Sequence, residues 1–401
     1  MFTRSQQKLI CLLLLVLAPW YTAAAPLQLN GVQVSYRFGE YLRFTGNLNI
    51  SEIVQTAYLF MTIPGELETF TGELNLDSSG NLSYEFPLDK HPLRAFSKPT
   101  YWIEITAQSG LKLTSQKATF YYTDNRYAWQ SRLSAPFQAY WYQGDAAFGQ
   151  MMIDESRAGL KKIQSIIPLP DPQEVKVYAY ASAQELRETL QLTEQHWVGA
   201  HADPDLNVIL LSLPAGPEQR IEMERQIPHE LMHVLLFKDL GGGYKNLPTW
   251  LNEGLASIAE LYPNPDYLSI LNKAQKNRAL IPIQSLCLSF PKDASNAYLA
   301  YAEATSFTNY LLQTHGSPAL NTLLGNYRNG MGCEQGVEAT YSQNLTQLEN
   351  QWRQGVFGEI FLTNAAGQIL PWLLLLGIVL AVPLMLSLVG IRKKAARQKS
   401  G

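Results

Sequence analysis

The stretch IPHELMHVLL occupies residues 227–236, and the stretch LPTWLNEGLASIAE occupies residues 247–260. The first stretch has the apolar periodicity of a helix, so His229 and His233 project from one face about one turn apart. That spacing lets two imidazole nitrogens reach a single metal ion. Glu230 lies about 100° further round the helix, where a carboxylate can accept a proton from a water molecule. A helix with two ordinary histidines and no metal is the alternative while this motif stands alone.

The second stretch supplies a third ligand. A hydrolytic zinc site takes three protein ligands and keeps one position for water, and two histidines with one glutamate suit this ion. Glu253 lies on a second predicted helix, and Asn252 beside it is expected to brace the ligands. Ser257 and Glu260 are further candidates for that supporting role, but an ordinary solvated position is the favoured interpretation for both. The predicted site comprises the metal ligands His229, His233 and Glu253, the catalytic residue Glu230 and the supporting residue Asn252.

HELMH followed by WLNEGLA resembles the gluzincin zinc metallopeptidases of the peptidase MA group. The pattern of that group is HExxH and then a second helix that carries N-E-x-x-A, and the layout of residues 130–355 is also similar to exported domains of this kind. The resemblance implies an α+β, zincin-type metallopeptidase domain over residues 132–358, with zinc as cofactor and a peptide or protein as substrate. In such a domain Glu230 activates a zinc-bound water that hydrolyses the peptide bond.

Tyr301 begins the stretch YAEATSFTNYLL, which is similar to a tyrosine-bearing turn and helix of the same relatives. In those proteins the tyrosine hydroxyl donates to the oxyanion of the tetrahedral intermediate, and one such donor contributes about 3 kcal/mol. The resemblance therefore implies a catalytic role for Tyr301, with Tyr298 as its rival. A tyrosine that only packs at a helix start is the alternative.

Two departures from the family pattern affect specificity. Nineteen residues separate His233 from Glu253, one more than is usual in the aminopeptidase branch, and the three glycines at 241–243 are expected to absorb the difference. The chain also lacks a recognisable G-x-M-E-N segment, which holds the free amine of the substrate in aminopeptidases. Exopeptidase specificity is therefore unsupported. The strand predicted at 207–213 is where an extended peptide is expected to bind, and His196 and His201 are interpreted as loop residues.

The N-terminal region has a different pattern of apolar residues, one that is typical of strands. Residues 27–125 contain about seven short, often alternating apolar runs separated by turn residues such as Asp77–Asn81, DSSGN. This pattern predicts an all-β sandwich of the immunoglobulin kind over 27–125. The expected role is a spacer or a binding module.

Both ends of the chain are predicted to be targeting segments. Arg4 and Lys8 precede an apolar run, and small residues follow it, which predicts a signal peptide at 1–25. Residues 369–391 are mostly apolar and uncharged, which predicts one C-terminal transmembrane helix, and 392–401 form a basic cytoplasmic tail. The expected location is the cell membrane, with a single pass and an extracytoplasmic catalytic domain. The alternatives are a retained N-terminal anchor and a buried core helix at 369–391.

The charge of the chain restricts the class of binding partner, and its cysteines predict a disulfide. Without the seven basic residues of the two ends, 24 of the 31 lysines and arginines remain against 34 aspartates and glutamates. This excess of acidic residues disfavours nucleic acid as a partner. No organic cofactor is expected. Cys287 and Cys333 are predicted to form a disulfide, with two unpaired buried thiols as the alternative.

The predicted function is that of an exported, membrane-anchored zinc metallopeptidase. A second hypothesis keeps the metal site but assigns the protein as a hydrolase that acts on cell-wall peptides or on another amide. A third hypothesis is a membrane-tethered adhesion or sensor protein whose metal site is vestigial.

Overall fold

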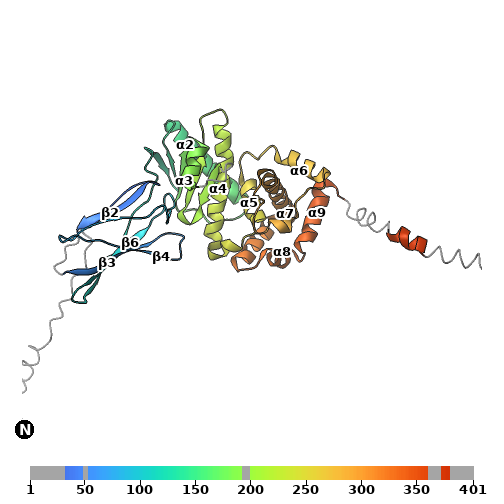
Figure 1. Ribbon diagram of the computed structural model, residues 1–401. Coiled ribbons are helices and arrows are strands. Elements are labelled where there is room, and N and C mark those ends of the chain that lie inside the picture. Colours follow the sequence, from blue (N-terminus) through green and yellow to red (C-terminus); the bar gives the residue numbers. More distant parts are fainter. Residues whose placement is uncertain (1–31, 48–52, 192–198, 360–371, 380–401) are drawn as a thin grey trace, which may run out of the picture. The chain divides into compact units, whose positions relative to one another are not determined.

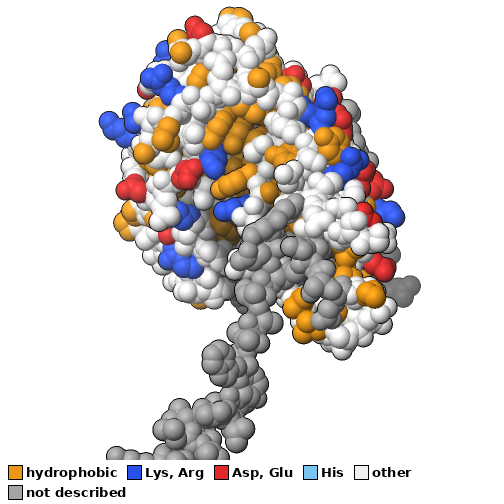
Figure 2. Space-filling view, turned by 90° about the vertical axis from the view of Figure 1, so that its left-hand side faces the viewer, with side chains coloured by type: hydrophobic (Ala, Val, Ile, Leu, Met, Phe, Trp, Pro, Cys, Tyr) orange, Lys and Arg blue, Asp and Glu red, His pale blue; other side chains and the backbone are white. Residues whose placement is uncertain are grey.

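The computed structural model describes residues 32–47, 53–191, 199–359 and 372–379 (Figure 1). The chain divides into two compact units, Met1–Ala128 and Trp129–Gly401. Each unit is built around its own sheets, and the second contains the motifs that point to a metal. On the face shown in Figure 2, acidic and basic side chains are interspersed among hydrophobic ones.

The first unit consists of two antiparallel sheets. Side chains alternate between buried and exposed along its strands, so that Leu59 and Met61 of β3 face inward with Ile103 and Ile105 of β6. One sheet has the order β1-β2-β5 and the other β4-β3-β6-β7, with β8 paired to β6. Their bounds are β1 Gln33–Arg37, β2 Tyr41–Asn47, β3 Val54–Thr62, β4 Thr69–Glu73, β5 Asn81–Glu85, β6 Thr100–Ala107, β7 Lys112–Thr114 and β8 Ala118–Thr119. The predicted β-rich region is present.

The second unit is α+β, as predicted. Its five-stranded sheet has the order β12-β13-β11-β10-β9, in which the three inner strands are parallel and both edge strands antiparallel. The strand bounds are β9 Gln130–Ser134, β10 Phe137–Trp141, β11 Val175–Tyr180, β12 Ala200–Asp203 and β13 Val208–Ser212. The apolar run at 207–213 is therefore an inner strand, whereas β12, which carries His201, forms the edge. The prediction that residues 207–213 form an edge of the sheet was wrong.

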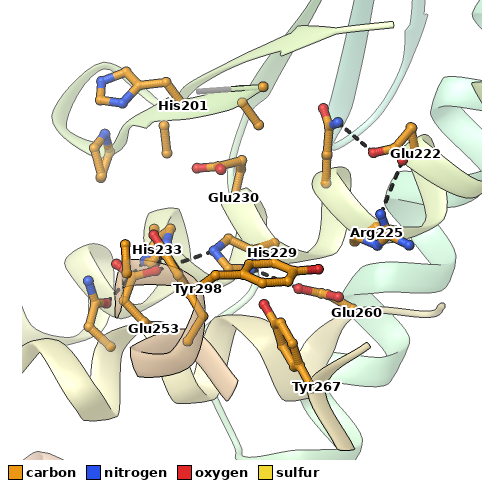
Figure 3. Close-up of a pocket in the computed structure, with 18 of the residues that line it drawn as sticks. His201, Glu222, Arg225, His229, Glu230, His233, Glu253, Glu260, Tyr267 and Tyr298 are labelled. Atoms are coloured by element: carbon orange, nitrogen blue, oxygen red, sulfur yellow. Dashed lines mark hydrogen bonds and ion pairs between the residues drawn. The ribbon is translucent and has the colours of Figure 1, made fainter. Parts of the chain in front are cut away.

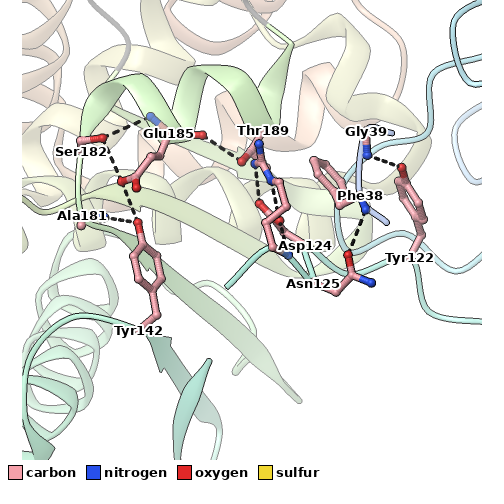
Figure 4. A network of polar contacts seen from close by, with 11 residues as sticks. Phe38, Gly39, Tyr122, Asp124, Asn125, Tyr142, Ala181, Ser182, Glu185 and Thr189 are labelled. Carbon is pink, nitrogen blue, oxygen red and sulfur yellow. Dashed lines mark hydrogen bonds and ion pairs between the residues drawn. The ribbon is translucent and has the colours of Figure 1, made fainter. Parts of the chain in front are cut away.

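Helices cover this sheet and then form a layer of their own (Figure 1). Polar contacts seat α3, since the Tyr142 hydroxyl donates to Glu185 at 2.7 Å and accepts from the Ala181 N–H at 2.8 Å (Figure 4). The sheet is accompanied by α2 Ala146–Ile166, α3 Ala183–Leu190 and α4 Gln219–Leu240, with the short helices η1 Pro204–Leu206 and η2 Gly241–Asn246. The helical layer comprises α5 Thr249–Ala259, α6 Tyr267–Lys276, η3 Ile283–Leu286, α7 Ala294–Arg328, α8 Cys333–Tyr341 and α9 Leu345–Phe357.

The helix α5 is the centre of the second layer. Trp250 is fully buried and its ring lies 5.0 Å from that of Phe307 on α7. A disulfide joins Cys287, which follows η3, to Cys333 at the start of α8, so the disulfide prediction is confirmed. The packing of α4, α5 and α7 against one another fixes the relative positions of the predicted site residues.

The predicted C-terminal transmembrane helix is wrong. Among the residues that the structure describes, no helix is long and apolar enough to cross a membrane. Of the predicted span, the structure describes residues 372–379, which are helical. The rest of the span lies outside the described residues, as do the predicted signal peptide at 1–25 and the tail at 392–401. The predicted single-pass location and the membrane as a partner are corrected by the same finding.

Candidate active site

The metal-ligand candidates meet where α4 and α5 cross (Figure 3). His229 and His233 project from α4, and Glu253 approaches them from α5. The Nε2 atoms of the two histidines lie 3.4 Å and 3.7 Å from the same oxygen, Glu253 Oε2. One donor atom from each of the three residues lies within 4.8 Å of the other two. The structure therefore brings together the three residues that the sequence predicted as ligands.

Each imidazole ring is oriented by an oxygen atom that contacts its Nδ1, the nitrogen remote from Glu253. His229 Nδ1 lies 3.1 Å from Glu260 Oε1, and His233 Nδ1 lies 3.1 Å from Asn252 Oδ1. When Nδ1 carries the hydrogen and donates it to these oxygens, Nε2 presents a lone pair toward Glu253. Asn252 occupies the position expected of it. Glu260, interpreted from the sequence as a solvated residue, is 4% exposed and supports His229.

The spacing along α5 contained a signal for Glu260. It follows Glu253 by seven residues, which is about two helical turns, so both carboxylates point to the same side of α5. Ser257, between them, is also buried. A carboxylate that shares the face of a metal ligand is a candidate for binding the far nitrogen of a ligating histidine.

The electrostatics of the cluster favour a cation. Burial lowers the pKa of His229, but hydrogen bonds to Glu253 and Glu260 outweigh burial and raise the pKa well above its ordinary value. Burial also raises the pKa of Glu253, and the neighbouring histidines reverse this effect, so the net pKa is lowered. The carboxylates thus hold positive charge between them. A divalent cation at the same point would take the place of that charge, and the donor set of two nitrogens and one oxygen fits zinc.

Tyr301 approaches the cluster from α7. Its ring centroid lies 6.4 Å from that of His229, and its hydroxyl lies near the carboxylate of Glu253. Burial and the nearby charges of Glu253 and Glu230 raise the pKa of Tyr301 well above its ordinary value, so the phenol keeps its proton. Its rival Tyr298 is 37% exposed, and its hydroxyl accepts a hydrogen bond from Asn264 at 2.6 Å. These contacts favour Tyr301 over Tyr298 as the phenol beside the ligand candidates.

Tyr244, which sequence reasoning missed, is a second phenol in the site. It lies on η2, and its hydroxyl donates to Asn252 Oδ1 at 3.4 Å. Burial raises the pKa of Tyr244 to about 12. Gly243 allows this placement, because a Cβ there would lie 2.5 Å from the Cα of Arg328. The three glycines at 241–243 thus do more than absorb an extra residue, since they form part of the turn that carries Tyr244.

A cleft of about 1020 Å³ surrounds the candidate residues. Glu230 is 8% exposed, lines this cleft and points toward β12 (Figure 3). The edge strand contributes the wall opposite α4, and His201, predicted in a loop, lies on that strand. The cleft therefore presents the ligand candidates, the carboxylate of Glu230 and the phenols of Tyr244 and Tyr301 to the same space, among its other lining residues.

The sequence from residue 156 to residue 358 matches the model of the Peptidase MA superfamily. The chain belongs to the Peptidase MA superfamily. The match covers both motifs of the site, and it confirms the family that the sequence resembled. No curated protein matches the chain.

This Peptidase MA protein is also similar to several solved structures at a low level. An M1 zinc metallopeptidase from Deinococcus radiodurans is 13% identical over 82% of this chain and 94% of its own, with a TM-score of 0.37. A mutant form of an M1 zinc metallopeptidase from that organism is 14% identical over 82% and 95%, with a TM-score of 0.36. A polysaccharide deacetylase from Bacillus cereus is 10% identical over 45% and 59%, with a TM-score of 0.20. At these TM-scores the similarities carry no argument about function.

Proposed function

We propose that this protein is a zinc-dependent peptidase whose catalytic domain spans residues 132–358. The observation that carries the proposal is the convergence of both histidine Nε2 atoms on Glu253 Oε2, at 3.4 Å and 3.7 Å, within a cleft that also contains Glu230. When bound by His229, His233 and Glu253, zinc supplies a Lewis acid for the carbonyl of the substrate. Membership of the superfamily supports the same activity.

In this proposal Glu230 moves the proton. Its carboxylate takes a proton from the attacking water and then gives that proton to the amine that leaves. Glu230 suits this role because its side chain lines the cleft one residue after the first histidine, yet is not among the three residues whose donor atoms converge. Glu260 and Asn252 keep the imidazole rings in place throughout.

Tyr301 stabilises the charge that develops on the carbonyl oxygen. Its hydroxyl retains a proton and lies beside the carboxylate of Glu253, so it is available as a donor. In the presence of substrate, the same hydroxyl turns to the oxyanion, and a preorganised donor of this kind contributes about 3 kcal/mol to transition-state stabilisation. We place the peptide along β12, the edge strand that lines the cleft, because an extended chain can add to the edge of a sheet.

The test is to compare the full chain with its Glu230→Gln variant on a peptide library. We expect the wild type to bind one zinc per chain and to cleave, and the variant to bind zinc but to lose at least about a hundredfold in rate. Glu338→Gln, an exposed change on α8 with the same loss of charge, is the control and should cleave normally. If zinc-loaded wild type cleaves nothing, or if Glu230→Gln cleaves equally well, the mechanism is wrong. Failure to bind zinc would favour a binding protein with a vestigial site.

A further inference from the structure

One end of the cleft is formed by charged and amide side chains that the proposed mechanism does not explain in full (Figure 3). Arg225 precedes His229 by four residues on α4, so its side chain lies one helical turn from the first metal-ligand candidate. We call this region the end wall. Its members, all of which line the cleft, are Glu222, Arg225, Gln226 and Glu260.

Contacts among these residues hold the end wall in place. Glu222 accepts a hydrogen bond from Arg225 Nη1 at 3.1 Å through Oε1, and one from Gln226 Nε2 at 2.8 Å through Oε2. The guanidinium of Arg225 also lies 5.8 Å from the ring centroid of Tyr262. Glu260 is fixed by His229 on the side of the metal-ligand candidates. The end wall is therefore a built surface rather than a set of freely moving side chains.

Some hydrogen-bonding capacity in the end wall is left over. Buried polar atoms in proteins nearly always have partners. Among the described residues, Arg225 Nε, Gln226 Oε1 and Glu260 Oε2 are buried and have none. Two of these three atoms are acceptors and only one is a donor. A group that fits this end of the cleft therefore has to bring more hydrogen-bond donors than acceptors.

The charges of the end wall have the same bias. Two carboxylates, on Glu222 and Glu260, and the single guanidinium of Arg225 line this end of the cleft, so the end wall carries one formal negative charge when His229 is neutral as a zinc ligand. Two tyrosines lie beside Glu260: the ring centroids of Tyr267 and Tyr298 are 5.5 Å apart, the ring planes are inclined at 69°, and both side chains line the cleft (Figure 3). Aromatic faces and carboxylates together attract ammonium and guanidinium groups.

We propose that the end wall is a substrate subsite for a basic side chain, lysine or arginine. The inference deepens the proposed function, because it rests on a peptide occupying the cleft. One helical turn of about 5.4 Å separates Arg225 from His229, and an extended peptide advances about 3.3 Å per residue. The basic residue therefore lies one or two positions from the bond that is cleaved.

The test measures binding rather than cleavage. The full-length Glu230→Gln protein, loaded with zinc, is titrated with fluorescent alanine-rich octapeptides that differ only in whether one scanned position holds lysine, norleucine or glutamate. Norleucine has the apolar stem of lysine without its charge. At one position, lysine should bind about tenfold more tightly than norleucine, and glutamate should bind less tightly than either.

Two variants of the wall should shift this lysine preference in opposite directions. Glu222→Gln removes a negative charge and should bring the ratio of lysine to norleucine affinity toward one. Arg225→Gln leaves two carboxylates without a guanidinium and should increase the ratio. A shared folding defect cannot produce opposite changes. Glu218→Gln, an exposed change just before α4, matches the charge loss of Glu222→Gln and should leave the ratio unaltered.

The outcomes separate this subsite from the proposed hydrolysis. Equal affinity for lysine and norleucine peptides, a preference for glutamate, or no peptide binding at all would overturn the subsite. If Glu230→Gln selects lysine peptides while the wild type leaves them intact, the subsite stands and the hydrolytic proposal falls. If the wild type cleaves peptides irrespective of their charge, the hydrolytic proposal stands and the subsite falls.

Discussion

Replacement of Gly254 by alanine should loosen the junction that places Glu253. Gly254 is buried where α5 meets α7, and a Cβ there would lie 2.6 Å from the backbone oxygen of Ala304 and 2.1 Å from Thr308 Oγ1. Contacts shorter than 3.0 Å are essentially never seen for a Cβ, and a backbone oxygen cannot rotate away. The two helices must therefore separate, and Glu253, the neighbouring residue, moves with α5.

The magnitude follows from two opposing effects. Alanine in place of glycine favours a helix by about 1 kcal/mol. Overpacking of a buried contact costs about 1–3 kcal/mol. Gly325 on α7 is the matched control, because a Cβ there meets nothing within 4 Å and only the favourable effect remains. We expect Gly325→Ala to raise the free energy of unfolding by about 1 kcal/mol. The free energy of unfolding of Gly254→Ala should be lower than that of Gly325→Ala by about 1–3 kcal/mol.

Urea unfolding of both variants, without metal, measures these differences. Zinc affinity is then measured by competition with a chelator, and it should fall for Gly254→Ala while Gly325→Ala keeps the wild-type value. The reasoning is refuted if the two alanine variants gain the same stability, or if Gly254→Ala is destabilised but binds zinc as tightly as the wild type.

Three further predictions concern the second unit. Burial raises the pKa of Glu303 on α7 from 4.5 to about 8, so between these pH values the folded state holds a proton that the unfolded chain has released. The free energy of unfolding, measured by urea titration, should therefore fall by about 3 kcal/mol between pH 6 and pH 9. Glu303→Gln should remove this pH dependence. Glu260→Gln should weaken zinc binding about 10- to 100-fold in chelator competition without unfolding the protein, because Oε1 no longer bears the charge that orients His229. Replacement of both Cys287 and Cys333 by serine should lower the free energy of unfolding by about 4 kcal/mol, since their sequence separation is 46.

The ligand candidates could be predicted because their spacing is local. The interval between His229 and His233 places both on one helical face, and the helix that carries Glu253 is readable from its own pattern. The partner of His229 could not be read with the same ease. Contact between Glu260 and His229 depends on how α4 and α5 cross, which is a property of tertiary packing.

The edge strand was misplaced for a physical reason that the sequence contains. Residues 208–212 read VILLS, in which four apolar residues follow one another, and all five are buried. Such runs are typical of inner parallel strands, which are covered on both faces. The edge strand is instead the four-residue segment Ala200–Asp203, AHAD, which is too short for its alternation to give a clear signal. At the C-terminus, hydropathy alone predicted a transmembrane helix. Among the described residues, no helix is long and apolar enough to be one.

The position of the disulfide divides the site into two parts. The covalent loop from Cys287 to Cys333 encloses α7 and with it Tyr301, whereas His229, His233 and Glu253 all precede the loop in the chain. Loss of the bond in a reducing environment therefore removes a covalent constraint from the segment that carries Tyr301, the proposed oxyanion donor, and leaves the metal-ligand candidates on helices outside that loop. Redox conditions should consequently act on turnover before they act on zinc retention, and a reduced sample that is fully loaded with metal need not be a fully active one.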